Sequence, residues 1–246
     1  MLHVVFRFVW LMVPAFMFVY LARDIASMRR RLARIRQTSR QPIAASPRSG
    51  TVEIEGAVVA EAGAARVAPL SGLPVVYSES RVYESHGSSR RNLVTHTVRS
   101  AFLVDDGSGV LARIDLTDTS ARVEPSELDR AVLVDKDKEA LALLAEHKHT
   151  RESAAKLSWE ESILAPGMRV YALGEAFDLP GGPAPAGYRD EPGRALGVRK
   201  GASGELFVAV GSEGEVEAKL RLQIKLRVVM MFASVIFAAF GFFASD

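Results

Sequence analysis

Residues 102–116 read FLVDDGSGVLARIDL and predict the element from which the fold is built, a β-hairpin. Apolar residues of high β-propensity lie on both sides of the DDGSG segment at residues 105–109. Its two glycines supply the positive φ that a tight hairpin turn needs. Asp105, Asp106 and Ser108 also resemble part of a calcium loop, but the ligand spacing and the distant glutamate of such loops are missing. We therefore predict a hairpin turn without a metal ion.

Other short segments around this hairpin also predict strands, because they carry β-branched or apolar residues and are bounded by glycine or proline. The predicted strands are residues 51–60, 75–82, 92–104, 110–116, 128–134 and 168–176, followed by a last hairpin formed by residues 197–200 and 205–210. The prolines and the glycine of residues 69–74, PLSGLP, predict a turn. Together these segments predict a small β-rich domain, either an OB-like barrel or a sandwich.

One helix is predicted inside this domain. Residues 137–157 are rich in Ala, Leu, Glu and Lys, and predict a helix with a short apolar stripe. His147 and His149 do not share a metal ion on such a helix, because residues i and i+2 point about 200° apart. Residues 179–194 are rich in proline and glycine and predict a surface loop.

The two ends of the chain predict membrane helices. Residues 2–22 contain one certain charge, Arg7, and reach the length needed to cross a hydrocarbon core of about 30 Å. Residues 228–244 contain no charge and are near the lower limit of length for a span. The alternatives are a cleaved secretory signal at the first end and an interfacial or buried helix at the second. We expect two transmembrane helices.

Basic residues border both predicted spans on the side of the central domain. By the positive-inside rule they place this domain in the cytoplasm and both termini outside, in the inner membrane of a bacterium. The side chains that we expect at the anionic membrane surface are Arg29, Arg30, Arg31, Arg34, Lys219, Arg221, Lys225 and Arg227.

Composition excludes several classes of protein. The 31 Lys and Arg residues nearly balance the 29 Asp and Glu residues, so the net charge of +2 is too low for a dedicated nucleic-acid-binding protein. The chain has no cysteine, which rules out disulfides, Cys-ligated zinc, Fe–S clusters and a thiol nucleophile. We predict neither a metal site nor a cofactor.

The order of several segments indicates a family. The segments are VEIEGAV at residues 52–58, PLSGLP at 69–74 running into Val76 and Tyr77, FLVDDGSG at 102–109, ESILAPGMRVYALGEA at 161–176 and SEGE at 212–215. Together they resemble the GIDE domain, also called the BAM ("beside a membrane") domain, of mitochondrial ubiquitin ligases and of many prokaryotic membrane proteins. The resemblance covers about residues 50–240 and implies a β-rich domain next to membrane helices.

The chain also departs from this family. Val75 stands where family members commonly have cysteine, and no cysteines are present to hold the zinc ions of the RING finger of the ligases. The resemblance therefore implies a prokaryote-like member without a RING finger. The mitochondrial relatives place the domain in the intermembrane space, whereas the charges here predict the cytoplasm.

These observations predict an α+β membrane protein in which the β-rich domain and its inserted helix lie between two transmembrane helices. The predicted boundaries are a first span at residues 1–23, a basic juxtamembrane helix and linker at 24–49, the β-rich domain at 50–211, an amphipathic basic helix at 212–227, and a second span with a short tail at 228–246.

No catalytic constellation accompanies this architecture in the sequence. The first hypothesis is a non-enzymatic binding or scaffold module at the cytoplasmic membrane face, which recruits a protein partner or senses the envelope and allows homo-oligomerisation. The second is a component of a ubiquitin-like modification system, and the third a hydrolase with a serine near His86 or His96. The candidate partner contacts are Tyr83, His86, Arg90, Arg91 and Tyr188.

Overall fold

The structure is a computed structural model of the whole chain. It describes residues 2–38, 41–61, 63–86, 89–118, 121–127, 137–148, 156–179, 195–201 and 206–243. The chain divides into two units. One unit contains the two ends of the chain, Met1–Ser39 and Glu213–Asp246, and the other contains the middle, Arg40–Ser212.

The first unit is a pair of long helices, α1 (Leu2–Gln37) and α3 (Glu213–Phe243). The second unit is rich in strands, and its described elements are η1 (Ile43–Ala45), β1 (Gly50–Val59), β2 (Arg66–Val67), β3 (Pro74–Val75), β4 (Tyr77–His86), β5 (Ser89–Arg99), β6 (Phe102–Asp105), β7 (Leu111–Ile114), β8 (Arg122–Glu124), β9 (Ser126–Glu127), α2 (Asp137–Glu146), β10 (Lys156–Leu164), β11 (Arg169–Leu179), β12 (Ala195–Arg199) and β13 (Phe207–Val210).

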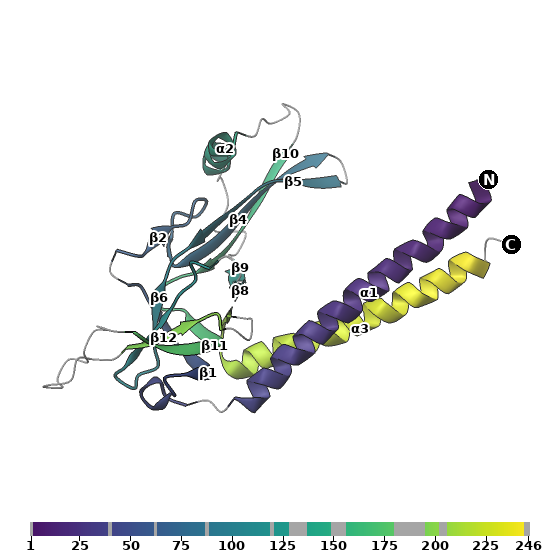
Figure 1. The fold of residues 1–246 in the computed structure, drawn as a ribbon. Coiled ribbons are helices and arrows are strands. Elements are labelled where there is room, and N and C mark those ends of the chain that lie inside the picture. Colours follow the sequence, from purple (N-terminus) through teal and green to yellow (C-terminus); the bar gives the residue numbers. More distant parts are fainter. Residues whose placement is uncertain are drawn as a thin grey trace, which may run out of the picture. The chain divides into compact units, whose positions relative to one another are not determined.

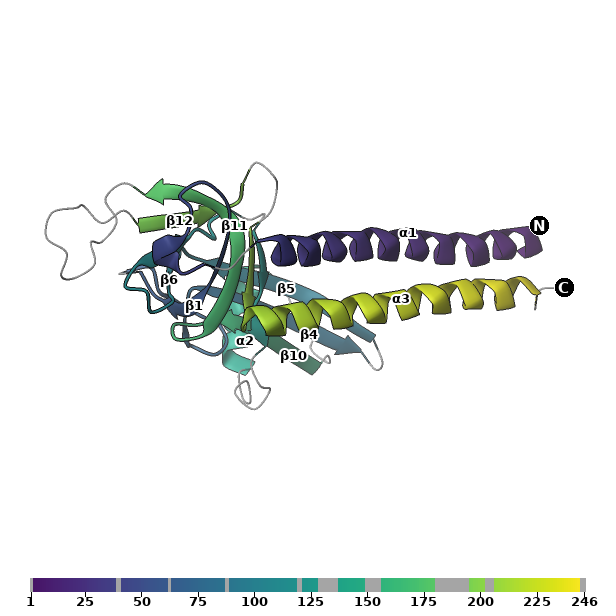
Figure 2. The same ribbon diagram turned by 90° about the horizontal axis from the view of Figure 1, so that it is seen from below.

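Five strands of the second unit form a closed barrel (Figure 2). Strand β1 pairs with β6 and with β11, β6 pairs with β7 in the predicted hairpin, and β7 pairs in parallel with β12, which returns to β11. Strand β13 also pairs with β11. It contacts residues 170–173 of β11, whereas β12 pairs with residues 175–179 of the same strand. Residues 197–210 therefore do not form the predicted hairpin, because both of their strands pair with β11.

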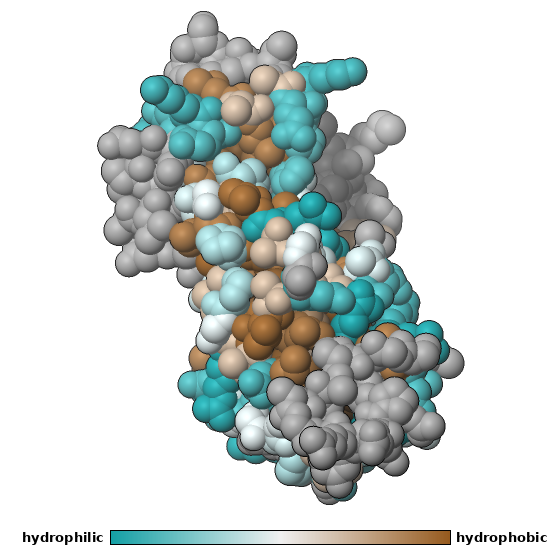
Figure 3. Space-filling model, turned by 90° about the vertical axis from the view of Figure 1, so that its left-hand side faces the viewer, coloured by the Kyte–Doolittle hydropathy of each residue, from teal (hydrophilic) through white to brown (hydrophobic). Residues whose placement is uncertain are grey.

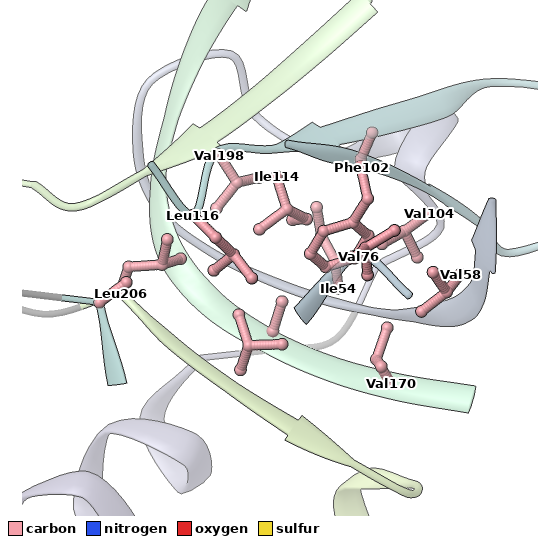
Figure 4. Packing of buried hydrophobic residues seen from close by; sticks show 14 of the residues in the cluster. Ile54, Val58, Val76, Phe102, Val104, Ile114, Leu116, Val170, Val198 and Leu206 are labelled. Carbon is pink, nitrogen blue, oxygen red and sulfur yellow. The ribbon is translucent and has the colours of Figure 1, made fainter. Parts of the chain in front are cut away.

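The interior of the barrel is the main hydrophobic core. Phe102 and Val104 of β6 and Ile114 of β7 are fully buried, because alternate residues of a strand point to the same face. Figure 4 shows them packed against Ile54 of β1 and Val170 of β11. Full burial of one such side chain contributes about 1.5–3 kcal/mol, so the cluster as a whole is a major source of the stability of this unit.

The DDGSG turn between β6 and β7 also holds the segment that precedes β1. Asp106 accepts hydrogen bonds from the backbone N–H groups of Ser108 (2.9 Å) and Ile43 (2.7 Å). The Ile43 side chain is fully buried in the core. Burial alone would raise the pKa of Asp106, but hydrogen bonds from Ser108 and from the Ile43 N–H outweigh it and lower the pKa. The predicted hairpin turn is confirmed, and its carboxylate has a tertiary role.

Replacement of Asp106 by asparagine is expected to lower the free energy of unfolding by about 1–2 kcal/mol, because one backbone N–H loses a charged acceptor. The matched variant is Asp105→Asn, which affects only the local bond to the Gly107 N–H (2.8 Å) and should cost less. Urea unfolding at neutral pH measures both values. Because the folded-state pKa of Asp106 is lowered, the difference between wild type and Asp106→Asn should disappear as the pH falls through that pKa. Equal losses for the two variants would contradict this role.

A second sheet, in the order β5–β4–β10–β9, extends away from the barrel strands (Figure 1). Strand β10 was not predicted, and the helix expected at residues 137–157 is shorter, since α2 ends at Glu146. The strand expected at residues 92–104 is split between β5 and β6, which belong to different sheets. The strand expected at residues 128–134 lies outside the described residues.

Helix α2 covers one face of this second sheet. Its residues Ala140, Leu143 and Leu144 pack against Val82 of β4 and Val94 of β5 in a smaller hydrophobic cluster. Not all apolar surface of the molecule is covered in this way. Figure 3 shows one face on which hydrophobic residues gather along the middle, with hydrophilic residues at their sides.

In the first unit, α1 and α3 lie side by side (Figures 1 and 2). The buried residues Leu21, Ile25 and Met28 of α1 are three or four positions apart, as expected of a stripe that faces a neighbouring helix. Two ion pairs also join the helices, Asp24 with Arg227 and Arg36 with Glu217, and Glu217 pairs in addition with Arg221 of its own helix. Large apolar side chains on both helices stay exposed, among them Phe16, Val19, Tyr20, Val229, Phe232 and Ile236.

The prediction of two transmembrane helices is wrong. Among the described residues, no helix is both long enough and apolar enough to cross a membrane. The predicted fold class, an α+β membrane protein, and the predicted localisation in an inner membrane are corrected accordingly. The structure is a β-rich fold with a five-stranded barrel and, in its described part, three α-helices.

Candidate functional site

The candidate site lies on the face of the second sheet opposite to α2. Tyr83 of β4, Arg90 of β5 and Glu160 of β10 meet there. The Tyr83 hydroxyl donates to Glu160 Oε2 (3.0 Å), Arg90 Nη1 donates to Glu160 Oε1 (2.9 Å), and the guanidinium lies over the Tyr83 ring, 3.6 Å from its centroid. Three strands thus contribute one side chain each to a connected cluster, which we call the Tyr83–Arg90–Glu160 cluster.

The charges and hydrogen bonds of the cluster shift the pKa values of two of the residues in and beside it, Glu160 and Arg81. Burial alone would raise the pKa of Glu160, but the hydrogen bonds from Arg90 and Tyr83 outweigh it and lower the pKa. Glu160 is therefore ionised at neutral pH, and its ion pair with Arg90 is lost only when the pH falls through this lowered pKa. Burial alone would lower the pKa of Arg81, but a hydrogen bond with Tyr83 and the charge of Glu79 raise it.

The same face continues along β4 toward the barrel. Arg81 forms an ion pair with Glu79, and the Tyr77 hydroxyl donates to Glu79 Oε2 (3.4 Å). The Arg99 guanidinium lies 5.6 Å from the centroid of the Tyr77 ring. Burial raises the pKa of Tyr77, and the charge of Glu79 raises it further. This face of β4 thus carries two tyrosines and one arginine around a single glutamate, Glu79.

Strand β5 forms the edge of this sheet. Its sequence, SRRNLVTHTVR, holds three arginines and no acidic residue. Arg90, Arg91, Thr95 and Thr97 are exposed. An edge strand presents unpaired backbone N–H and C=O groups to solvent, so this edge combines hydrogen-bonding capacity with positive charge.

The structure brings together two of the predicted partner contacts and separates a third. Tyr83 and Arg90 share the cluster, whereas Arg91 follows Arg90 directly and points to the opposite face of the strand. The side chain of His86 and all of Tyr188 lie outside the described residues. Glu160, which joins Tyr83 to Arg90, was missed, because its segment was not predicted to be a strand. The alternation of apolar Leu157, Trp159 and Ile163 is the signal that points to one.

The residues predicted at a membrane surface have other surroundings in the helix pair. Arg31 is buried, Arg221 pairs with Glu217, and Arg227 pairs with Asp24. The contacts predicted for Arg29, Arg30, Arg34, Lys219 and Lys225 stay untested, but the spans beside which they were expected are wrong.

The third hypothesis, a hydrolase, has one structural counterpart. Ser80 of β4 lies directly opposite His96 of β5 and opposite Glu161 of β10 in the strand register. The Ser80 hydroxyl donates to Glu161 Oε1 (2.6 Å), however, and the side chain is fully buried. Its proton is therefore directed to a carboxylate and not to an imidazole, which disfavours a role as nucleophile.

Glu161 has a structural role instead. This buried carboxylate accepts hydrogen bonds from the backbone N–H groups of Leu70 (3.0 Å) and Ser71 (2.8 Å) as well as from Ser80. It thus attaches the PLSGLP turn at residues 69–74 to the second sheet. The turn itself was predicted and is confirmed, since the Gly72 N–H donates to the Ala68 carbonyl (2.9 Å) with Gly72 at φ +74°.

Replacement of Glu161 by glutamine is expected to lower the free energy of unfolding by about 2–3 kcal/mol, because an amide N–H₂ then faces a buried N–H donor. The matched variant is Glu160→Gln on the same strand, which changes a half-exposed ion pair and should cost less than about 1 kcal/mol. Urea unfolding at neutral pH measures both. A loss for Glu161→Gln no greater than that for Glu160→Gln would contradict the attachment of the turn.

Groups that could hold a metal are sparse in the part of the chain that the structure describes. No three His, Asp or Glu side chains come together there in a geometry that could hold a metal ion. No family model, no curated protein and no solved structure matches this chain. The resemblance to the GIDE domain therefore stays a prediction.

Proposed function

We propose that this chain is a non-enzymatic binding module that recruits a protein partner, and that an extended acidic segment of the partner pairs with the edge of β5. The observation that supports this proposal is the long basic edge of β5 next to the Tyr83–Arg90–Glu160 cluster. An extended peptide that adds a strand to such an edge gains main-chain hydrogen bonds, and pockets for alternate side chains give specificity.

The charge of the edge favours an acidic partner over a second copy of the chain. Two β5 strands paired with each other would bring their arginines together, and like charges directly opposite each other are destabilising. Glutamate or aspartate at alternate positions of a partner strand would instead lie together on one face of the sheet, where they could face Arg90.

The Tyr83–Arg90–Glu160 cluster also favours binding at this place. Tyrosine and arginine are enriched among the residues that dominate interface energies. Arg90 is already held by Glu160 and by the Tyr83 ring, so less side-chain freedom is lost when a partner binds. Arg90 and Tyr83 are therefore the expected centre of the interface, and Arg91 and Thr95 are expected at its margin.

The test uses the full chain and a fluorescent peptide of about twelve residues that alternates glutamate with valine or threonine. Fluorescence anisotropy should show saturable binding that weakens with salt. Arg90→Glu should weaken binding by at least about tenfold, because like charges then oppose each other. A peptide with lysine in place of glutamate should not bind.

The matched control is Arg66→Glu, which makes the same charge change at an exposed position of β2, outside the second sheet. It should leave the affinity for the acidic peptide within about twofold of wild type. Equal binding of the acidic and basic peptides, or equal effects of Arg90→Glu and Arg66→Glu, would overturn the proposal.

A role in a ubiquitin-like modification system has no support in the structure or in the comparisons and stays a prediction. Such a role would require a partner that supplies the catalytic domain, and the same β5 edge would be the first place to look for its contact.

A further inference from the structure

The structure places two imidazole rings against each other at the end of α2, far apart in sequence and separate from the Tyr83–Arg90–Glu160 cluster. His96 belongs to β5 and His147 follows the last residue of α2. Nδ1 of His96 lies 3.5 Å from Nε2 of His147, and the ring centroids are 5.3 Å apart at an interplanar angle of 87°. We propose that these two rings bind one divalent transition-metal ion of the zinc class.

The distances fit two ligands better than they fit a hydrogen bond. A separation of 3.5 Å exceeds the roughly 2.7–3.2 Å that is typical of hydrogen bonds donated by N–H groups. Two imidazoles on one tetrahedral zinc ion, with Zn–N distances of about 2.0–2.1 Å, place their nitrogens about 3.4 Å apart. If both rings point at the ion, their centroids lie about 5.2 Å apart in the same geometry. Both observed values are within about 0.1 Å of these.

The hydrogen bonding of His147 leaves its Nε2 atom, which faces His96, available to bind a metal ion. Its Nδ1 lies 3.0 Å from the Leu143 carbonyl oxygen. Because a carbonyl only accepts hydrogen bonds, Nδ1 carries the proton, and Nε2 of the neutral ring keeps its lone pair toward His96. A second ring nitrogen that donates to a backbone carbonyl is the usual arrangement of metal-binding histidines, since it fixes both the tautomer and the ring orientation.

The backbone at the end of α2 also holds His147 in place. Lys148 has φ +56° and is the one non-glycine residue of the described chain in the left-handed region. Its N–H donates to the Ala145 carbonyl (3.0 Å), while the His147 N–H donates to the Leu143 carbonyl (3.2 Å). Leu143 itself is buried against the sheet. The metal-binding nitrogen is thus attached to a helix turn that is anchored in the small hydrophobic cluster.

Exposure of the pair leaves room for further ligands. His147 is exposed and His96 is half-buried, so water or a ligand from solution would complete the coordination. Imidazole suits zinc, nickel and copper, whereas calcium and magnesium prefer oxygen ligands. The ion would join α2 to the edge strand of the second sheet, and it should therefore raise the resistance of that region to unfolding.

The test is isothermal titration calorimetry of the metal-free full chain with zinc chloride, combined with NMR of the histidine ring protons. We expect one zinc ion per chain, and signals of two rings that shift together over the same range of zinc concentration. His96→Gln and His147→Gln should each weaken zinc binding by at least about tenfold.

The matched control is His149→Gln, which removes a histidine two positions from His147 and should change the zinc affinity by less than about twofold. Circular dichroism of all variants should be unchanged, since both side chains of the pair are accessible to solvent. Absence of zinc binding, or binding that survives His96→Gln unchanged, would overturn the proposal. Binding that depends on His147 and His149 but not on His96 would overturn it as well.

Discussion

The pairing of β1 with β11 is the interaction on which the rest of the β-rich unit depends. Eight residues of β1 face eight residues of β11 in one uninterrupted antiparallel register, from Gly50 opposite Ala176 to Ala57 opposite Arg169. This pairing closes the barrel and places Ile54 and Val170 in the same core as Phe102. A slip of one residue would turn every core side chain of one strand outward, so the register is set by burial itself.

A second constraint follows where β1 meets β6. A Cβ atom at Gly56 would lie 2.3 Å from the Asp105 carbonyl oxygen, so only glycine permits the two backbones to approach. The same strand end continues into the turn whose Asp106 holds Ile43 in the core. The barrel and the segment that precedes it are thus fixed by one short region of β1 and β6, while β5 is the terminal strand of the second sheet as far as the structure describes it.

Local chemistry explains which elements the sequence could predict. The turn at residues 105–109 has its glycines at positive φ, and residues 51–60 and 168–176 correspond closely to β1 and β11. The alternation that indicates strand β10 is interrupted at Glu161, where a core-facing position holds a carboxylate whose partners come from a distant turn, and the strand was therefore missed. The Tyr83–Arg90–Glu160 cluster and the contact of His96 with His147 depend on pairings between remote segments, which no local pattern encodes. The two apolar ends were predicted to be membrane spans, and the finding against this is that no helix among the described residues is long and apolar enough to be one.

Because the barrel is closed by strands that are remote in sequence, its folding during synthesis on the ribosome is delayed. The parallel pairing of β7 with β12 joins residues 112–114 of β7 to residues 196–198 of β12. Likewise, β1 can form its eight-residue pairing only after β11 has been synthesised. Such a topology has a high contact order and folds slowly, since long loops must close before their contacts are rewarded. Strands β1 and β7 emerge long before β11 and β12 are synthesised, so the nascent chain exposes apolar strand edges that attract chaperones.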